Sequence, residues 1–261
     1  MKYLFGEWEF VRDRIRRAQT LFLLLDYDGT LTPIVARPEL ALCSPKVKVL
    51  LEKLRDCPGV SVAIMSGRSL EDIRGKIGVS RITYVGNHGL EIENPAGIHR
   101  KRLSPAREEE LKTIRMTLEE TLRFIPGILL EDKGPILTVH YRNAPPEYSG
   151  NVPQVVEKVA EKGKDRWQIV SGKKILEIRP RVNFGKGKAV RDLLKTIPAD
   201  GLLPIYLGDD RTDEDAFRVL EDRGISIFVG PGSTTSDARY FLNDPSEVQE
   251  FLQRCEEILR N

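Results

Sequence analysis

The sequence predicts an α/β protein in which a smaller α+β domain is inserted into a parallel β-sheet domain. Two short apolar runs, at 21–25 and 203–207, each end in a group of aspartates. Buried parallel strands have this pattern when their carboxyl ends open into a site. Strand and helix patterns alternate in both outer parts of the chain. In the middle the order changes to α-β-β-α-β-β, which indicates a separate unit.

Hydrophobic periodicity assigns the elements of the outer segments in order. Before the insertion we expect a helix at 7–18, a strand at 21–25, a helix at 45–56, a strand at 60–66, a helix from Leu70, and a strand, turn and strand over 81–94. After it we expect a helix at 186–196, a strand at 203–208, a helix at 214–220, a strand at 225–230 and an amphipathic helix at 246–260.

The middle of the chain has the pattern of two α-β-β units. The expected elements are a helix at 106–123, strands at 127–132 and 135–142 around a tight turn at Lys133–Gly134, a helix at 152–162, and a hairpin of 166–172 and 173–180 around Gly172–Lys173. Domain boundaries are expected near 103–105 and 180–184. The larger domain would then comprise 1–104 and 184–261, and the inserted domain 105–183.

The first apolar run leads into DYDGTL, where Asp26 and Asp28 are two residues apart. In an extended chain these side chains point the same way, so one carboxylate can attack while the other moves a proton. Gly29 permits a sharp turn, and Thr30 offers a hydroxyl to an anion. A strand cap with an Asx turn is the structural alternative.

The second apolar run leads into GDDRTDED, which supplies Asp209, Asp210 and Asp213. Ligands of open α/β sheets bind at the carboxyl edge of the strands. Clustered carboxylates at this edge favour a hard divalent cation, and Mg²⁺ typically uses one or two of them together with a substrate phosphate. The sequence therefore predicts a Mg²⁺ site.

Four motifs, in this order, resemble those of the haloacid dehalogenase (HAD) phosphohydrolases, which have a Rossmann-like parallel-sheet core. They are DYDGTL, IMSGR at 64–68, FGKGKAV around Lys186 and GDDRTDED at 208–215. By itself, the serine of IMSGR is equally well explained as a helix N-cap, and Lys186 by itself would be interpreted as a solvated surface lysine. Their order relative to the two acidic groups favours the resemblance.

The resemblance implies a mechanism. Asp26 would be the nucleophile that forms an aspartyl-phosphate, and Asp28 would protonate the leaving oxygen and then activate water. Mg²⁺ would be held by Asp26, the backbone carbonyl of Asp28 and Asp209, with Asp213 nearby or acting through water. The phosphoryl oxygens would be bound by Thr30, Ser66, Gly67 and Lys186.

Composition excludes several other classes of protein. A formal net charge of +2 gives no nucleic-acid footprint, and the basic stretch at 12–17 fits the solvated face of a helix. Cys43, Cys57 and Cys255 form neither an even disulfide framework nor a metal-binding spacing. We expect reduced thiols and a cytoplasmic protein. No run approaches the ~18–20 apolar residues of a membrane span.

A closer resemblance covers nearly the whole chain. GNHGLEI, LEDKGPILTVHYR, LEIRP and GDDRTDEDAF are similar to segments of the trehalose-6-phosphate phosphatases, a HAD family with an inserted lid of the C2B type. This implies hydrolysis of trehalose 6-phosphate to trehalose and phosphate. It implies that glucose hydroxyls are bound by Glu131, Lys133 and Glu177. The other substrate-binding positions it indicates are Arg68, Asn87, His88, His140, Arg142 and Arg179.

The residues of the inserted domain also support binding of a polyol. Acidic and basic side chains lie where predicted strands meet turns, and a sugar hydroxyl can donate to the first and accept from the second. An exposed hairpin would carry the same charges. His140 and Arg142 would share one face of a strand, although a histidine at the edge of the core is an equal alternative.

Other functions stay open. The motifs of the larger domain bind only phosphate and metal, so they do not separate trehalose 6-phosphate from sucrose phosphate, mannosyl-3-phosphoglycerate or glucosyl-3-phosphoglycerate. A non-catalytic sugar-phosphate sensor is the alternative outside enzymes. It would usually have lost one of the acids, all of which are present here. The chain has no synthase domain, so we expect a free-standing phosphatase or one that associates with a trehalose-6-phosphate synthase.

Overall fold

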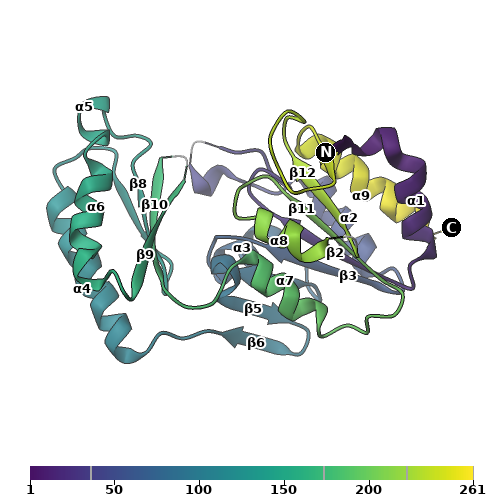
Figure 1. The fold of residues 1–261 in the computed structure, drawn as a ribbon, viewed down its shortest axis with the longest axis horizontal. Coiled ribbons are helices and arrows are strands. Elements are labelled where there is room, and N and C mark those ends of the chain that lie inside the picture. The colour runs from purple at the N-terminus through teal and green to yellow at the C-terminus, as the bar shows by residue number, and fades with distance from the viewer. Residues whose placement is uncertain (36, 173, 222, 261) are drawn as a thin grey trace. The chain divides into compact units, whose positions relative to one another are not determined.

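The computed structural model describes residues 1–35, 37–172, 174–221 and 223–260. Contacts divide the chain into two compact units, coloured along the chain in Figure 1. Unit 1 comprises Met1–Arg100 and Phe184–Asn261, and unit 2 comprises Lys101–Asn183. The first division falls four residues before the boundary expected from the sequence, because the strand that ends at Arg100 completes the sheet of unit 1.

Among the described residues, nine strands form the sheet of unit 1, in the order β1-β13-β12-β11-β2-β3-β4-β5-β6 (Figure 1). Their bounds are β1 (Lys2–Tyr3), β2 (Thr20–Asp26), β3 (Val60–Met65), β4 (Thr83–Gly86), β5 (Glu91–Asn94), β6 (Gly97–Arg100), β11 (Leu202–Gly208), β12 (Ile225–Val229) and β13 (Tyr240–Leu242). Taken in this order, neighbouring strands from β1 as far as β4 pair in parallel. The last two pairs, β4 with β5 and β5 with β6, are antiparallel. The predicted fold class is confirmed.

The two apolar runs of the sequence are neighbouring strands. In the register of β2 and β11, Leu21 pairs with Leu203 and Leu25 pairs with Leu207. Both strands run in the same direction, so the acidic residues that follow them emerge at the same edge of the sheet. This pairing places the candidate site.

Helices cover both faces of the sheet because the β2 side chains alternate. Leu21, Leu23 and Leu25 pack with one set of helices, and Phe22 and Leu24 pack with the other. The first set is α1 (Trp8–Arg17), α2 (Pro45–Arg55), α3 (Leu70–Ile77) and α9 (Pro245–Arg260), and the second is α7 (Lys186–Leu194) and α8 (Glu214–Leu220). Short 3₁₀ helices are η1 (Leu4–Glu7), η2 (Pro38–Leu40) and η3 (Asn87–Gly89).

Unit 2 is an antiparallel sheet with helices on one face. Within its described residues the strand order is β7-β8-β10-β9, with β7 (Leu129–Asp132), β8 (Leu137–His140), β9 (Trp167–Gly172) and β10 (Ile175–Pro180). The helices are α4 (Pro105–Leu122), α5 (Pro146–Ser149), α6 (Val152–Ala160) and the 3₁₀ helix η4 (Glu161–Gly163). Leu118 of α4 and Val139 of β8 are fully buried in the shared core.

Several short elements were not expected from the sequence. β1 and β13 have two and three residues, too few to show a periodic pattern, and they depend on tertiary pairing. The ring of Tyr3 lies 5.5 Å from that of Phe241 across this pair. The β6 strand and the four-residue α5 were also missed. Lys173 of the expected second hairpin lies outside the described residues.

None of the helices in the described part of the chain has both the length and the apolar character required to cross a bilayer. The long helix of unit 2, α4, illustrates this, since its first turns carry several charged residues.

Truncating Leu118 to alanine should lower the free energy of unfolding of unit 2 by about 2–5 kcal/mol, because it leaves a cavity in a fully buried position. Met116 lies on the same helix but is 59% exposed, so Met116→Ala should change it by no more than about 0.5 kcal/mol. Urea unfolding followed by Trp167 fluorescence in a Trp8→Phe background measures both. Equal effects would contradict the packing of α4.

Candidate active site

A buried polar cluster lies at the carboxyl end of β2 and β11. The Lys186 Nζ donates to Asp26 Oδ1 at 2.5 Å and to Asp213 Oδ1 at 2.7 Å. The Tyr206 hydroxyl, on β11, donates to the same Asp213 oxygen at 2.6 Å. All four side chains are buried. The structure thus brings together Asp26 of the first motif, Asp213 of the fourth and Lys186 of the third.

The charged groups of this cluster shift one another's pKa values. Burial raises the pKa of Asp26 well above its usual value, and the charges of Asp213 and Asp209 raise it further, against the opposing effect of Lys186. Burial alone would lower the pKa of Lys186, but attraction to Asp213 and Asp26 outweighs it and raises that pKa. The lysine therefore stays charged, whereas a negative charge on Asp26 is disfavoured by burial and by the neighbouring carboxylates.

Glycine residues allow the acidic side chains to approach the backbone. A Cβ added at Gly29 would lie 2.1 Å from Oδ2 of Asp209, and Gly29 has a φ of +86°. Only glycine meets both requirements without strain. At Gly208, an added Cβ would lie 2.3 Å from Cγ of Asp213. The turn in DYDGTL is therefore fixed by close packing against the fourth motif.

The donor set of this site fits a hard divalent cation. Asp26, Asp209 and Asp213 each offer a carboxylate oxygen, and these three atoms lie within 4.8 Å of one another. Three carboxylates gather around one ammonium group, and a divalent cation compensates such an excess of negative charge. The hydroxyl of Thr30 is buried and has no hydrogen-bond partner among the described residues, so it is available to a ligand.

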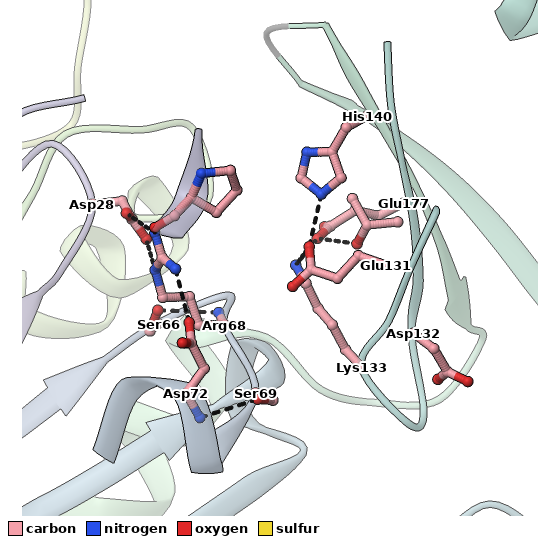
Figure 2. A network of polar contacts seen from close by, with 12 residues as sticks. Asp28, Ser66, Arg68, Ser69, Asp72, Glu131, Asp132, Lys133, His140 and Glu177 are labelled. Atoms are coloured by element: carbon pink, nitrogen blue, oxygen red, sulfur yellow. Dashed lines mark hydrogen bonds and ion pairs between the residues drawn. The ribbon is translucent and has the colours of Figure 1, made fainter. Parts of the chain in front are cut away.

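Asp28 lies apart from this cluster and is held by an arginine. The Arg68 Nε and Nη2 atoms donate to the two carboxylate oxygens of Asp28, each at 2.7 Å (Figure 2). Arg68 was expected to line the sugar-phosphate side, and the structure places its guanidinium on Asp28. Tyr27, between the two aspartates, is buried and donates its hydroxyl to the carbonyl of Ala41.

The loop carrying Ser66 is joined to the Asn-His-Gly turn. The backbone N–H of Asn87 donates to Arg68 O at 2.7 Å, and that of His88 donates to Ser66 O at 3.0 Å. Asn87 and His88 have φ values of +48° and +55°, a left-handed conformation that costs energy in non-glycine residues. The His88 ring also lies against Gly67, where a Cβ would be 2.5 Å from its Cε1.

In unit 2, Glu177 is the centre of a second polar network. It accepts from Lys133 Nζ at 3.0 Å and from the Thr138 hydroxyl at 3.3 Å, and it pairs with Arg179 through its other oxygen. Glu177 is only 4% exposed, so these partners stabilise a buried charge. Strand pairing explains the arrangement, because Glu177 of β10 lies opposite Thr138 of β8.

Glu131 and His140 extend the network of unit 2. The His140 Nε2 and Glu131 Oε2 atoms are 2.7 Å apart, and Lys133 Nζ is 3.8 Å from the same oxygen (Figure 2). These side chains lie on the face of the sheet opposite α4. Arg142 is different. β8 ends at His140, so strand alternation does not place exposed Arg142 on this face, and that part of the sequence argument was wrong.

Sequence reasoning missed several residues that contact the predicted ones. They are Asp72, Glu91, Thr138 and Tyr206. Glu91 accepts from the Asn87 amide at 2.8 Å and from the N–H of Leu70 at 3.0 Å. Of these residues, only Tyr206 could have been found from the sequence. It lies within the apolar run that leads into GDD, and a buried hydroxyl needs a hydrogen-bond partner.

Metal binding should raise the melting temperature. The pKa of Asp26 is higher in the folded than in the unfolded chain, so its contribution to stability is present below the usual aspartate pKa and is lost as the pH rises through the raised value. Mg²⁺ at about 100 times its Kd should add about 2.7 kcal/mol, a rise of about 5–10 °C. In differential scanning fluorimetry, this rise should be larger at about pH 8 than at about pH 5.

Gly29→Ala should abolish most of this rise, because the added Cβ collides with the Asp209 carboxylate. Gly75→Ala is the matched control, since nothing lies within 4 Å of its added Cβ. An equal response to Mg²⁺ in both variants would contradict the metal site.

Comparison with known proteins finds relatives over most of this chain. The model of the family described as trehalose-phosphatase matches residues 24–246. Trehalose-phosphate phosphatase B of Arabidopsis thaliana is 35% identical over 258 residues, covering 94% of this chain and 68% of its own. Trehalose-phosphate phosphatase of Mycobacterium bovis is 36% identical over 246 residues, covering 91% and 62% respectively.

Solved structures give the same result. The C-terminal domain of the trehalose-6-phosphate phosphatase from C. albicans superposes with a TM-score of 0.81 at 26% identity, covering 95% of this chain and 96% of that one. The C-terminal domain of the Candida albicans trehalose synthase regulatory protein shares the fold at 13% identity, with a TM-score of 0.69. From the family match and the identity to these relatives, the chain belongs to the trehalose-phosphatase family.

Proposed function

We propose that this protein is a Mg²⁺-dependent phosphatase that hydrolyses trehalose 6-phosphate to trehalose and phosphate. The observation that carries the proposal is the family match over residues 24–246, a span that contains the acidic site of unit 1 and the whole of unit 2. The relatives from Arabidopsis thaliana and Mycobacterium bovis are themselves named trehalose-phosphate phosphatases.

The residues of unit 1 would carry out the phosphoryl transfer. In the first step a carboxylate oxygen of Asp26 bonds to phosphorus, the bond from phosphorus to the sugar oxygen breaks, and Asp28 gives that oxygen a proton. In the second step Asp28 takes a proton from water, whose oxygen attacks the aspartyl-phosphate and releases phosphate and free Asp26. Lys186, held against Asp26, lowers the pKa of this carboxyl against the raising effects of burial and of the neighbouring acids, and so favours the ionised nucleophile.

Binding of the phosphoryl group is assigned to the motif residues around this site, namely Thr30, Ser66, Gly67 and Lys186. The carboxylates of Asp26 and Asp209 and the carbonyl of Asp28 would hold Mg²⁺, with Asp213 nearby. The bound ion would neutralise charge on the phosphoryl oxygens. Supporting this, the Thr30 hydroxyl is buried and has no hydrogen-bond partner within the described chain.

Unit 2 is the proposed cap, and its network would bind the sugar. Glu131 and Glu177 would accept hydrogen bonds from glucose hydroxyls, and Lys133 would donate one. Their mutual contacts hold these groups in place before substrate arrives, which limits the cost of ordering them. Asn87, His88, His140, Arg142 and Arg179 remain the other proposed substrate-side residues.

The alternatives differ in what they require of this chain. Sucrose phosphate or a glycosyl-3-phosphoglycerate would use the same phosphoryl chemistry, so only the sugar separates these substrates. A sensor would bind sugar phosphate without turnover. The regulatory protein's likeness shows the fold alone, and the complete set of acids here supports catalysis. Association with a synthase, as the source of substrate, and a cytoplasmic location are part of the proposal.

Phosphate release decides between these substrates. With Mg²⁺, we expect turnover of trehalose 6-phosphate and little or none of sucrose 6-phosphate, glucose 6-phosphate or mannosyl-3-phosphoglycerate. Asp26→Asn should lower kcat by at least about 10⁴-fold, because removal of a covalent nucleophile leaves only binding and charge stabilisation. Folded protein that releases phosphate from none of these esters would favour the sensor.

Substitutions in unit 2 test the sugar assignment. Glu177→Gln should lower kcat/KM for trehalose 6-phosphate about 10- to 100-fold, because it removes a charged hydrogen-bond acceptor, while a small aryl phosphate should be spared. Asp132→Asn is the control, since Asp132 pairs with Arg115 and lies apart from the network (Figure 2). Equal losses on both esters would exclude sugar recognition by Glu177.

A further inference from the structure

Arg68 holds the Asp28 carboxylate by both oxygens. Its Nε and Nη2 atoms form two parallel hydrogen bonds of 2.7 Å (Figure 2). A paired contact of this kind fixes the plane of the carboxylate as well as its position, which a lysine does not do. Asp28 itself is 44% exposed at its side chain, so little else restrains it.

A second carboxylate holds Arg68 from the other side. The Nη1 atom donates to Asp72 Oδ2 at 2.8 Å, and Nη2 also donates to the carbonyl of Pro38 at 2.9 Å. Asp72 lies in the first turn of α3, where the helix N-terminus stabilises its negative charge. The N–H of Asp72 donates to Ser69, the N-cap of that helix.

The buried position of Arg68 distinguishes this chain of contacts from an ordinary surface ion pair. Exposed ion pairs contribute little, but the Arg68 side chain is only 10% exposed. Burial would lower its pKa, and the hydrogen bonds and charges of Asp28 and Asp72 raise it instead. The backbone N–H of Arg68 also donates to the Ser66 hydroxyl at 3.1 Å. One residue thus fixes two groups of the proposed site.

We propose that Arg68 and Asp72 are positioning residues that hold the carboxylate of Asp28 in its working orientation. This inference rests on the proposed function, in which Asp28 must reach first the leaving oxygen and then water. Proton transfer requires hydrogen-bond geometry, and a displacement of about 1 Å can cost about 100-fold in rate. Asp72 contacts neither the acidic cluster nor the phosphoryl-binding residues in any contact the structure gives.

The test measures kcat and KM for trehalose 6-phosphate separately. Asp72→Asn should lower kcat about 10-fold while KM changes less than about 2-fold, as expected for loss of a supporting contact. Arg68→Lys keeps the charge but loses the paired contact, and should lower kcat about 100-fold. The double variant should be no slower than Arg68→Lys alone, because both act through Asp28.

Asp192→Asn is the matched control. Asp192 pairs with Lys188 at the same spacing of four residues, and its side chain is 44% exposed against 42% for Asp72. Its kcat should equal that of the unaltered chain.

An observation that needs no turnover tests the ion pair directly. In ¹⁵N-labelled protein the Nε–H signal of Arg68, identified by its loss in Arg68→Lys, should be protected from exchange with solvent. Asp28→Asn should abolish that protection, and Asp192→Asn should not. Should Asp72→Asn fail to fold, Arg68→Lys and this signal still decide the matter.

The contrary outcomes are distinct. Unchanged kcat in Asp72→Asn, or a raised KM with unchanged kcat in Arg68→Lys, would overturn positioning, and the second would return Arg68 to substrate binding. Additive losses in the double variant would also overturn it. If the unaltered chain releases no phosphate from trehalose 6-phosphate, the proposed function fails, and an unprotected Arg68 signal would remove the inference independently.

Discussion

The site depends on one buried ammonium group. Lys186 begins α7, the first helix after unit 2, and contacts Asp26 at the end of β2 and Asp213 after β11. A buried charge is costly unless it is paired, so burial of Lys186 requires these three segments to come together. The same contact joins the parts of unit 1 that precede and follow the insertion. Stability of the larger unit and assembly of the site are therefore linked.

Glycine residues determine how closely side chains approach the backbone at this site. Gly29 lies against Asp209, Gly67 against His88 and Gly208 against Asp213 so closely that an added Cβ would overlap each side chain. The approach of these side chains leaves no room to relax, because the backbone is fixed by the sheet and its turns. Positive φ values at Asn87 and His88 add strain in the same region. Such strain persists when the surrounding contacts over-determine the conformation.

The sequence was sufficient for the central strands of the sheet in unit 1, but not for its short edge strands or for all contacts made by its side chains. Apolar runs ending in acids predicted β2 and β11, and the βα pattern predicted a parallel sheet, in which the structure shows these two strands to be neighbours. The β1–β13 pair could not be predicted, because two or three residues carry no period. In the sequence, Asp72 is indistinguishable from any other acid in the first turn of a helix. Its role depends on the position of Arg68, which the sequence does not give. Arg142 was misplaced because the sequence did not indicate that β8 ends at His140.

The polar networks of the two units differ in their balance of charge. In unit 1 the carboxylates outnumber the ammonium group, which leaves charge that the proposed metal and phosphoryl group would complete. In unit 2 the acids and bases contact one another, so Glu177 is already compensated by Lys133, Thr138 and Arg179. If unit 2 binds the sugar as proposed, a sugar hydroxyl would then replace or bridge an existing contact. A ligand that lacks the hydroxyl cannot make the hydrogen bond that would compensate for the lost contact. Such a network would therefore discriminate between ligands as well as bind them.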